Sequence, residues 1–211
     1  MLLGFDMTHR CNLLCSFCWK FMDKAEFGDI TDEQVEKFCA YFSNVQTPYI
    51  RIVGGEPLVH PKFKDIILRL GQTFIDMDFL VVTNGMLLTD ELVRLPNTNY
   101  IVTQYPQNQA VIRKFSGRVT VTKRDYFDRD HDPDLSDEQA RDIHKRCGYR
   151  QLRVIGDNLY DCCHAETLER LGRSPSVHVK VKRNCDIELL NRTDTWKECI
   201  HCFIGDGGKL V

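Results

Sequence analysis

Short apolar runs alternate with amphipathic stretches along the first 127 residues, the pattern of strands and helices in a parallel α/β sheet. Amphipathic spacing predicts a helix that begins at Thr31, whose hydroxyl has capping-box spacing with Gln34, and further helices near residues 60, 89 and 108. Runs of β-branched and aromatic residues predict strands at residues 2–8, 49–54, 79–83, 100–104 and 119–123. These units are too few to close an eight-stranded barrel, so we expect an open partial (β/α) barrel of about five to six parallel strands.

The pattern changes after residue 124. Six aspartates and Pro133 fall within residues 125–137, which is typical of a solvated linker. Ser136 and Gln139 then have capping-box spacing and predict a helix that ends near Arg146. We therefore expect a core, a connecting linker with a helix, and a small cysteine-rich α+β domain, at residues 1–127, 128–146 and 147–211.

Charge and hydropathy exclude several kinds of partner. The chain has 28 Lys and Arg against 30 Asp and Glu, a net charge of −2, so no broad positive field favours nucleic acid or an anionic membrane. No uncharged apolar run approaches the roughly 18 residues that span a bilayer. The N-terminus lacks the regions of a signal peptide, so we expect a cytoplasmic protein.

Ten cysteines in 211 residues are the main anomaly of the composition. In a reducing compartment, clustered cysteines more often hold metal than form disulfides. The first group, Cys11, Cys15 and Cys18, has the spacing C-x3-C-x2-C. Three thiolates suit a 4Fe-4S cluster whose fourth iron stays open to a ligand, with zinc or simple burial as the alternatives.

A second group of cysteines lies near the C-terminus. Four of its thiolates could hold either zinc or a second iron-sulfur cluster, and spacing alone does not choose between them. We favour Cys162 over its neighbour Cys163 as a ligand, and Cys185 is another candidate to complete the set. The expected ligands are Cys147, Cys162, Cys199 and Cys202.

The first cysteine group and three downstream motifs together resemble the radical S-adenosylmethionine (radical SAM) superfamily. Phe17 is the aromatic residue that the family usually carries before its third cysteine, and Gly54-Gly55-Glu56-Pro57 looks like the family's GGEP motif. Asn84 and Gln104 follow the third and fourth predicted strands and are looser matches to further SAM-facing positions. Each downstream match lies at the carboxyl end of a predicted parallel strand, where α/β barrels keep their active sites.

The resemblance implies a set of residue roles and a reaction. Cys11, Cys15 and Cys18 would ligate the SAM-binding 4Fe-4S cluster. Glu56 would anchor the SAM amine, and the SAM-facing positions would be Phe17, Gly54, Gly55, Asn84 and Gln104. The enzyme would reductively cleave SAM to a 5′-deoxyadenosyl radical that takes a hydrogen atom from substrate. A flavodoxin- or ferredoxin-type reductant is the implied electron donor.

The second cysteine group resembles the twitch domain, a shortened SPASM domain with one auxiliary 4Fe-4S cluster. Residues 151–155 and 159–161 flank Gly156-Asp157-Asn158 and predict a β-hairpin before Cys162, similar to the family's Asp-Gly-x-x-x-Cys hairpin. Asn158 stands at the turn position where glycine is usual.

We expect a radical SAM enzyme of oxidoreductase or isomerase type, most simply one that oxidises a small polar molecule by two electrons with the help of the auxiliary cluster. The alternatives are radical modification, epimerisation or isomerisation of a peptide, nucleotide or modified base, and, from another class, a non-catalytic metal-cluster module. Tyr105 is a candidate catalytic residue. Lys20 is a candidate substrate contact, although a charged residue is more often on the surface.

Overall fold

The computed structural model describes residues 2–15, 18, 20–22, 28–123, 136–147, 150–162, 164–172 and 178–190. Its strands are β1 (Leu3–Asp6), β2 (Tyr49–Val53), β3 (Asp78–Thr83), β4 (Thr98–Thr103), β5 (Thr120–Thr122), β6 (Arg150–Ile155), β7 (Asn158–Cys162) and β8 (Val179–Lys180). Its α-helices are α1 (Asp32–Phe42), α2 (Phe63–Thr73), α3 (Gln109–Lys114), α4 (Asp137–Arg146), α5 (Ala165–Arg170) and α6 (Cys185–Leu190). Short 3-10 helices lie at Pro57–Val59, Leu92–Arg94 and Pro106–Asn108.

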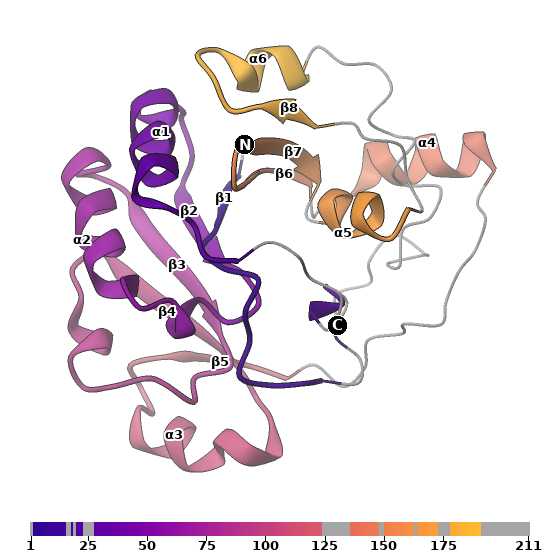
Figure 1. Cartoon of the computed structure of the whole chain (residues 1–211). Helices are drawn as coiled ribbons and strands as arrows, with labels where there is room; N and C mark the ends of the chain where they lie inside the picture. Colours follow the sequence, from indigo (N-terminus) through magenta and orange to yellow (C-terminus); the bar gives the residue numbers. More distant parts are fainter. Residues whose placement is uncertain are drawn as a thin grey trace.

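The strands form one open sheet in the order β5-β4-β3-β2-β1-β6-β7-β8 (Figure 1). Neighbours from β5 to β6 are parallel, whereas β7 and β8 pair antiparallel. The terminal strands β5 and β8 do not pair with each other, so the sheet does not close into a barrel. This arrangement confirms the expected open α/β sheet.

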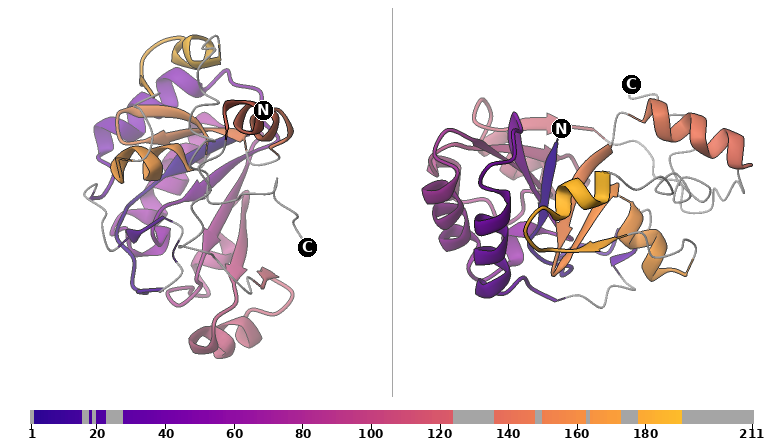
Figure 2. Two further views of the ribbon diagram at one scale, coloured as in Figure 1. Left: turned by 90° about the vertical axis from the view of Figure 1, so that its right-hand side faces the viewer. Right: turned by 90° about the horizontal axis from the view of Figure 1, so that it is seen from above.

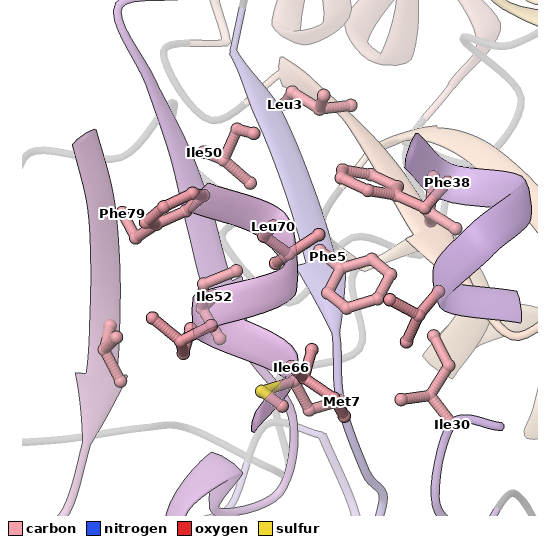
Figure 3. Close-up of a cluster of buried hydrophobic side chains, with 14 of the residues drawn as sticks. Leu3, Phe5, Met7, Ile30, Phe38, Ile50, Ile52, Ile66, Leu70 and Phe79 are labelled. Atoms are coloured by element: carbon pink, nitrogen blue, oxygen red, sulfur yellow. The ribbon is translucent and has the colours of Figure 1, made fainter. Parts of the chain in front are cut away.

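The helices α1 and α2 cover one face of the sheet and enclose the main apolar core (Figure 3). Strand β1 contributes Leu3 and Phe5 to this core, and the ring of Phe5 lies 4.4 Å from that of Phe38 on α1. The predicted capping box is present, since Thr31 and Gln34 exchange hydrogen bonds at the start of α1. Local polar pairing thus starts the helix, and its apolar side packs against alternate residues of the strands.

The helix predicted near residue 89 is wrong, because the chain forms only the 3-10 helix Leu92–Arg94 there. The N-cap residue of this segment is Glu91, and the Thr89 hydroxyl accepts a hydrogen bond from the Leu92 amide at 3.2 Å. Pro96 lies two residues beyond this segment and β4 begins at Thr98, which leaves no room for an α-helix.

No helix in the described part of the chain is long and apolar enough to cross a membrane.

The C-terminal hairpin extends the same sheet. Strand β6 lies parallel to β1, with Phe5 opposite Val154. Helix α4 begins with the predicted capping box of Ser136 and Gln139 and lies at the periphery of the molecule (Figure 2). The hairpin turn differs in detail from the expectation, since Gly156 has the positive φ of 56° and Asn158 begins β7. The boundary between the expected domains remains a prediction.

Candidate functional site

The loop that follows β1 carries the first three cysteines. Cys11, Cys15 and Cys18 are half-buried free thiols, and the Cys18 amide donates a hydrogen bond to the Cys15 carbonyl at 3.1 Å. Burial raises the pKa of Cys11 to about 11; the Leu13 amide opposes this rise, and the negative charges of Glu56, Cys18 and Cys15 add to it. Cys11 therefore lies close enough to the Glu56 carboxylate to be affected by its charge.

This donor set fits the expected cluster. Three half-buried thiols from one short loop supply the thiolates that an iron-sulfur cluster requires. No three metal-binding side chains among the described residues converge on a single point. A 4Fe-4S cluster does not need such convergence, because each thiolate binds a different iron.

The Gly-Gly-Glu-Pro motif packs directly against the start of the cysteine loop. The Gly55 amide donates to the Thr8 carbonyl at 2.7 Å, and the Glu56 amide donates to the Arg10 carbonyl at 2.9 Å. A Cβ on Gly54 would stand 2.4 Å from the Thr8 carbonyl oxygen, and one on Gly55 would stand 2.4 Å from that of Arg10. Both glycines are therefore needed for backbone contact with the loop.

The side chain of Glu56 is buried at the carboxyl ends of β2 and β3. Its Oε1 accepts hydrogen bonds from the Leu58 amide at 3.0 Å and the Thr83 hydroxyl at 2.6 Å, and its Oε2 accepts one from the Asn84 amide at 2.6 Å. Burial raises the pKa of Glu56, and these three bonds oppose the rise. A carboxylate has about four acceptor positions, so these three bonds leave one acceptor position unused.

The segments that follow β3 and β4 are tied together by an asparagine that sequence reasoning missed. The fully buried amide of Asn108 donates to the Asn84 carbonyl at 2.6 Å and the Thr103 carbonyl at 2.7 Å, and it accepts from the Tyr105 amide at 2.9 Å. Asn84 in turn donates from its side chain to Asn12 in the cysteine loop at 2.7 Å. The partners Asn84 and Asn108 are 24 residues apart in the sequence, so no local pattern indicates this role.

Gln104 and Tyr105 lie directly after β4, as expected. The Gln104 side chain donates to Gln109 at 3.2 Å, and its backbone amide donates to the Thr122 carbonyl at 2.8 Å. Both residues are half-buried. Their positions agree with the sequence expectation, and their roles remain predictions.

Part of the second cysteine group is described. Cys147 caps the end of α4, and Cys162 ends β7, where its Sγ accepts a hydrogen bond from the His164 amide at 3.4 Å. Both thiols are half-buried, whereas Cys185 is fully buried and burial raises its pKa. Cys163, Cys199, Cys202 and Phe17 lie outside the described residues.

A buried cluster of charged side chains, which sequence reasoning also missed, lies on the face of the sheet opposite α1 and α2. Asp6 accepts hydrogen bonds from Lys20 Nζ at 2.6 Å and Arg153 Nε at 2.5 Å. Burial alone would raise the pKa of Asp6, but the Arg153 and Lys20 charges hold it well below its usual range. Burial and Arg153 lower the pKa of Lys20 to about 8, against the opposing pull of Asp6. The expected surface position of Lys20 is therefore wrong. The sequence did offer a signal for the other two residues, because Asp6 and Arg153 are charged residues within strands β1 and β6.

Comparison with known proteins places these observations in a family context. Residues 5–98 match the model of the Radical SAM superfamily. The chain is 31% identical over 99 residues to GTP 3',8-cyclase from Aquifex aeolicus, a match that covers 44% of this chain and 30% of that protein. It is 30% identical over 103 residues to the mycofactocin maturase MftC of Mycobacterium tuberculosis, covering 48% of this chain and 26% of that protein.

Another relative is the subtilosin biosynthesis protein AlbA of Bacillus subtilis, at 32% identity over 94 residues, which covers 44% of this chain and 20% of that protein. The chain thus matches less than a third of the length of each of these relatives. Among solved structures, BtrN in complex with AdoMet and 2-DOIA superimposes with a TM-score of 0.64 and 15% identity, covering 94% of this chain and 88% of that one. At this identity the likeness concerns the fold.

Proposed function

We propose that this chain, whose residues 5–98 match the model of the Radical SAM superfamily, is an enzyme that cleaves SAM to abstract a hydrogen atom from a small polar substrate. Cys11, Cys15 and Cys18 hold the SAM-binding 4Fe-4S cluster. The reaction is a two-electron oxidation, in which the substrate loses a hydrogen atom and then an electron and a proton; an auxiliary cluster, when bound, would supply the acceptor for that electron. This second cluster is held by Cys147, Cys162, Cys199 and Cys202.

The observation that carries the proposal is the shared environment of Glu56 and the cysteine loop. The Glu56 carboxylate is 1% exposed, and the Glu56 amide donates a hydrogen bond at 2.9 Å to the carbonyl of Arg10, the residue before Cys11. A buried carboxylate with an acceptor position left over, beside three thiols, suits a ligand that brings an ammonium group to a metal cluster. SAM has this chemistry, because its methionine part carries the amine.

Different residues of the chain bind SAM and orient the groups that bind it. Glu56 accepts hydrogen bonds from the SAM amine, and the Thr83 hydroxyl and Asn84 amide keep its carboxylate oriented. Gly54 and Gly55 hold the cysteine loop against the end of β2. When bound, a reduced cluster supplies one electron that breaks the sulfonium bond of SAM.

Two classes of substrate follow from different observations. The cysteines near the C-terminus support an auxiliary electron acceptor, and hence an oxidation of a small polar molecule. The names of the curated relatives support the alternative, because one is a GTP 3',8-cyclase, another a mycofactocin maturase and a third a protein of bacteriocin biosynthesis. Tyr105, at the end of β4, is the proposed catalytic side chain at the substrate.

The first experiment asks whether the protein cleaves SAM. The protein is reconstituted anaerobically with iron and sulfide, dithionite and SAM are added, and 5′-deoxyadenosine is quantified. The triple variant Cys11→Ala, Cys15→Ala, Cys18→Ala is compared with Cys39→Ala, which removes a buried core thiol on α1. We expect product from the wild type and Cys39→Ala but not from the triple variant.

An absence of 5′-deoxyadenosine from fully loaded protein, with candidate substrates present, would contradict the proposal and favour a non-catalytic cluster protein. Substrate class is tested by offering deuterated polyols and amino alcohols, GTP and peptides separately. The true substrate transfers deuterium to 5′-deoxyadenosine. A product lighter by two hydrogen atoms supports oxidation, whereas one of unchanged mass supports epimerisation or isomerisation.

A further inference from the structure

Arg170, in the C-terminal part of the sequence, forms hydrogen bonds with the chain immediately after the third cysteine. Lys20 is fixed at both ends, because its ammonium group donates to Asp6 on β1 at 2.6 Å and its carbonyl accepts from Arg170 Nη2 at 2.7 Å. Arg170 also donates to the Phe21 carbonyl at 3.3 Å. One guanidinium on α5 therefore binds two successive carbonyls located two and three residues beyond Cys18.

The segment that Arg170 contacts has an unusual backbone conformation. Phe21 is buried and has φ of 47°, in the left-handed region that bulky residues rarely adopt. Its amide donates to the Cys18 carbonyl at 2.9 Å, so the turn begins at the cysteine itself. Such a backbone persists only where surrounding contacts determine it, and the bond from Arg170 is one of them.

Arg170 is itself held in place. Its Nε donates to Glu166 one helical turn earlier at 2.8 Å, and both side chains are only 11–12% exposed. Glu166 lies 4.0 Å from His9, which precedes the first cysteine by two residues, and the other ring nitrogen of His9 lies 3.8 Å from Asp6. Helix α5 therefore contacts the cysteine loop at both of its ends.

We propose that Arg170 is a positioning residue for the SAM-cluster loop, through its hydrogen bonds to the carbonyls of Lys20 and Phe21. Helix α5 thereby makes cluster binding in the N-terminal part depend on a segment about 150 residues away. The planar guanidinium can serve two acceptors in fixed directions, which a lysine ammonium does not reproduce. The inference rests on the proposed function only in taking Cys18 as a cluster ligand.

The first test uses the full chain without iron or SAM, so it does not depend on catalysis. Amide hydrogen exchange of residues 18–22 is measured in the wild type, Arg170→Ala and Arg69→Ala. Arg69 is the matched control, because it forms a similar pair with Glu36 on the exposed side of α2. We expect exchange to rise about tenfold in Arg170→Ala alone. Equal exchange in the wild type and a folded Arg170→Ala would overturn the proposal.

The second test measures the retention of the cluster and its response to SAM rather than catalytic turnover. After reconstitution, the loss of iron to a chelator and the SAM-dependent change in the EPR signal of the reduced protein are compared across variants. Arg170→Ala is expected to lose its SAM-responsive cluster several-fold faster than the wild type, with Arg170→Lys in between. If Arg170→Ala does not fold, Glu166→Gln replaces it and is expected to loosen the same loop. Unchanged exchange and chelation in Glu166→Gln would also overturn the proposal.

Discussion

The Oε2 atom of Glu56 accepts a hydrogen bond from the backbone amide of Asn84 at 2.6 Å. The bond joins the residue proposed to anchor SAM to the segment after the next strand of the sheet. Glu56 thus organises part of the site even in the absence of a ligand, because its other oxygen also binds Thr83 and Leu58. A substitution at Glu56 is expected to change both structure and binding.

Glu56→Gln is expected to weaken SAM binding by at least about tenfold and to destabilise the protein by about 1–3 kcal/mol. The amide group places a donor opposite donors that now bind carboxylate oxygens. Both effects are measured by equilibrium binding of SAM to reconstituted protein and by denaturant unfolding. The control is Glu36→Gln, on the exposed side of α1. Wild-type affinity in Glu56→Gln would contradict the assigned role.

Gly55→Ala is expected to displace the cysteine loop, because the added Cβ would stand 2.4 Å from the Arg10 carbonyl oxygen. Iron content after reconstitution should fall, and chelators should remove the remaining iron faster. Gly28→Ala is the matched control, since nothing lies within 4 Å of its Cβ position. Equal iron retention in the two variants would show that the loop accommodates the methyl group.

Asn108→Asp is expected to separate the ends of β3 and β4, because an ionised carboxylate cannot donate to the Asn84 and Thr103 carbonyls. Leaving these buried acceptors unsatisfied should cost about 1–3 kcal/mol of stability or more. SAM affinity should fall with it if Asn84 contacts SAM. Asn99→Asp, at an exposed position of β4, is the control for the added charge. A stable Asn108→Asp variant with normal affinity would refute this prediction.

Asp6 makes the stability of the protein sensitive to acid. Its folded pKa lies below the unfolded value of about 3.9, so the unfolded state binds more protons and stability falls as the pH drops through this range. Asp6→Asn is expected to lose about 3–5 kcal/mol at neutral pH and to show a shallower pH dependence below about pH 4. Denaturant unfolding of the iron-free protein at several pH values measures both effects.

Asp90→Asn serves as the control for Asp6, because Asp90 also pairs with a lysine but lies on the surface. It should change the acid dependence much less. If the wild type and Asp6→Asn have the same slope against pH, Asp6 is not the group responsible.

The auxiliary cluster gives a separate prediction about metal content. Cys162→Ala is expected to lower the iron of reconstituted protein by about four atoms per chain while leaving the SAM-responsive EPR signal in place. Cys185→Ala, which removes a buried thiol of α6, should leave the iron content unchanged. Loss of iron in Cys185→Ala instead would move the ligand assignment to that residue.

Several features of the fold could be predicted from the sequence because they depend on local patterns. The capping boxes at Thr31 and Ser136 formed as expected, since both partners lie within one helical turn. Strand positions followed from runs of β-branched residues, and the three-cysteine loop from its spacing. The helix predicted near Thr89 is the exception. Only a 3-10 helix forms there, because Pro96 follows within a few residues and an α-helix cannot continue through it.

The sequence by itself determined which residues are predicted to carry the chemistry: the three cysteines of the loop after β1, and Glu56 just beyond the end of β2. Only the tertiary structure decided which residues hold them. Asp6 and Arg153 are 147 residues apart, and they meet because β6 pairs with β1. Arg170 reaches the chain beyond Cys18 for the same reason. The partners of buried charges and of loop carbonyls are set by strand order and packing, which no local pattern of side chains encodes.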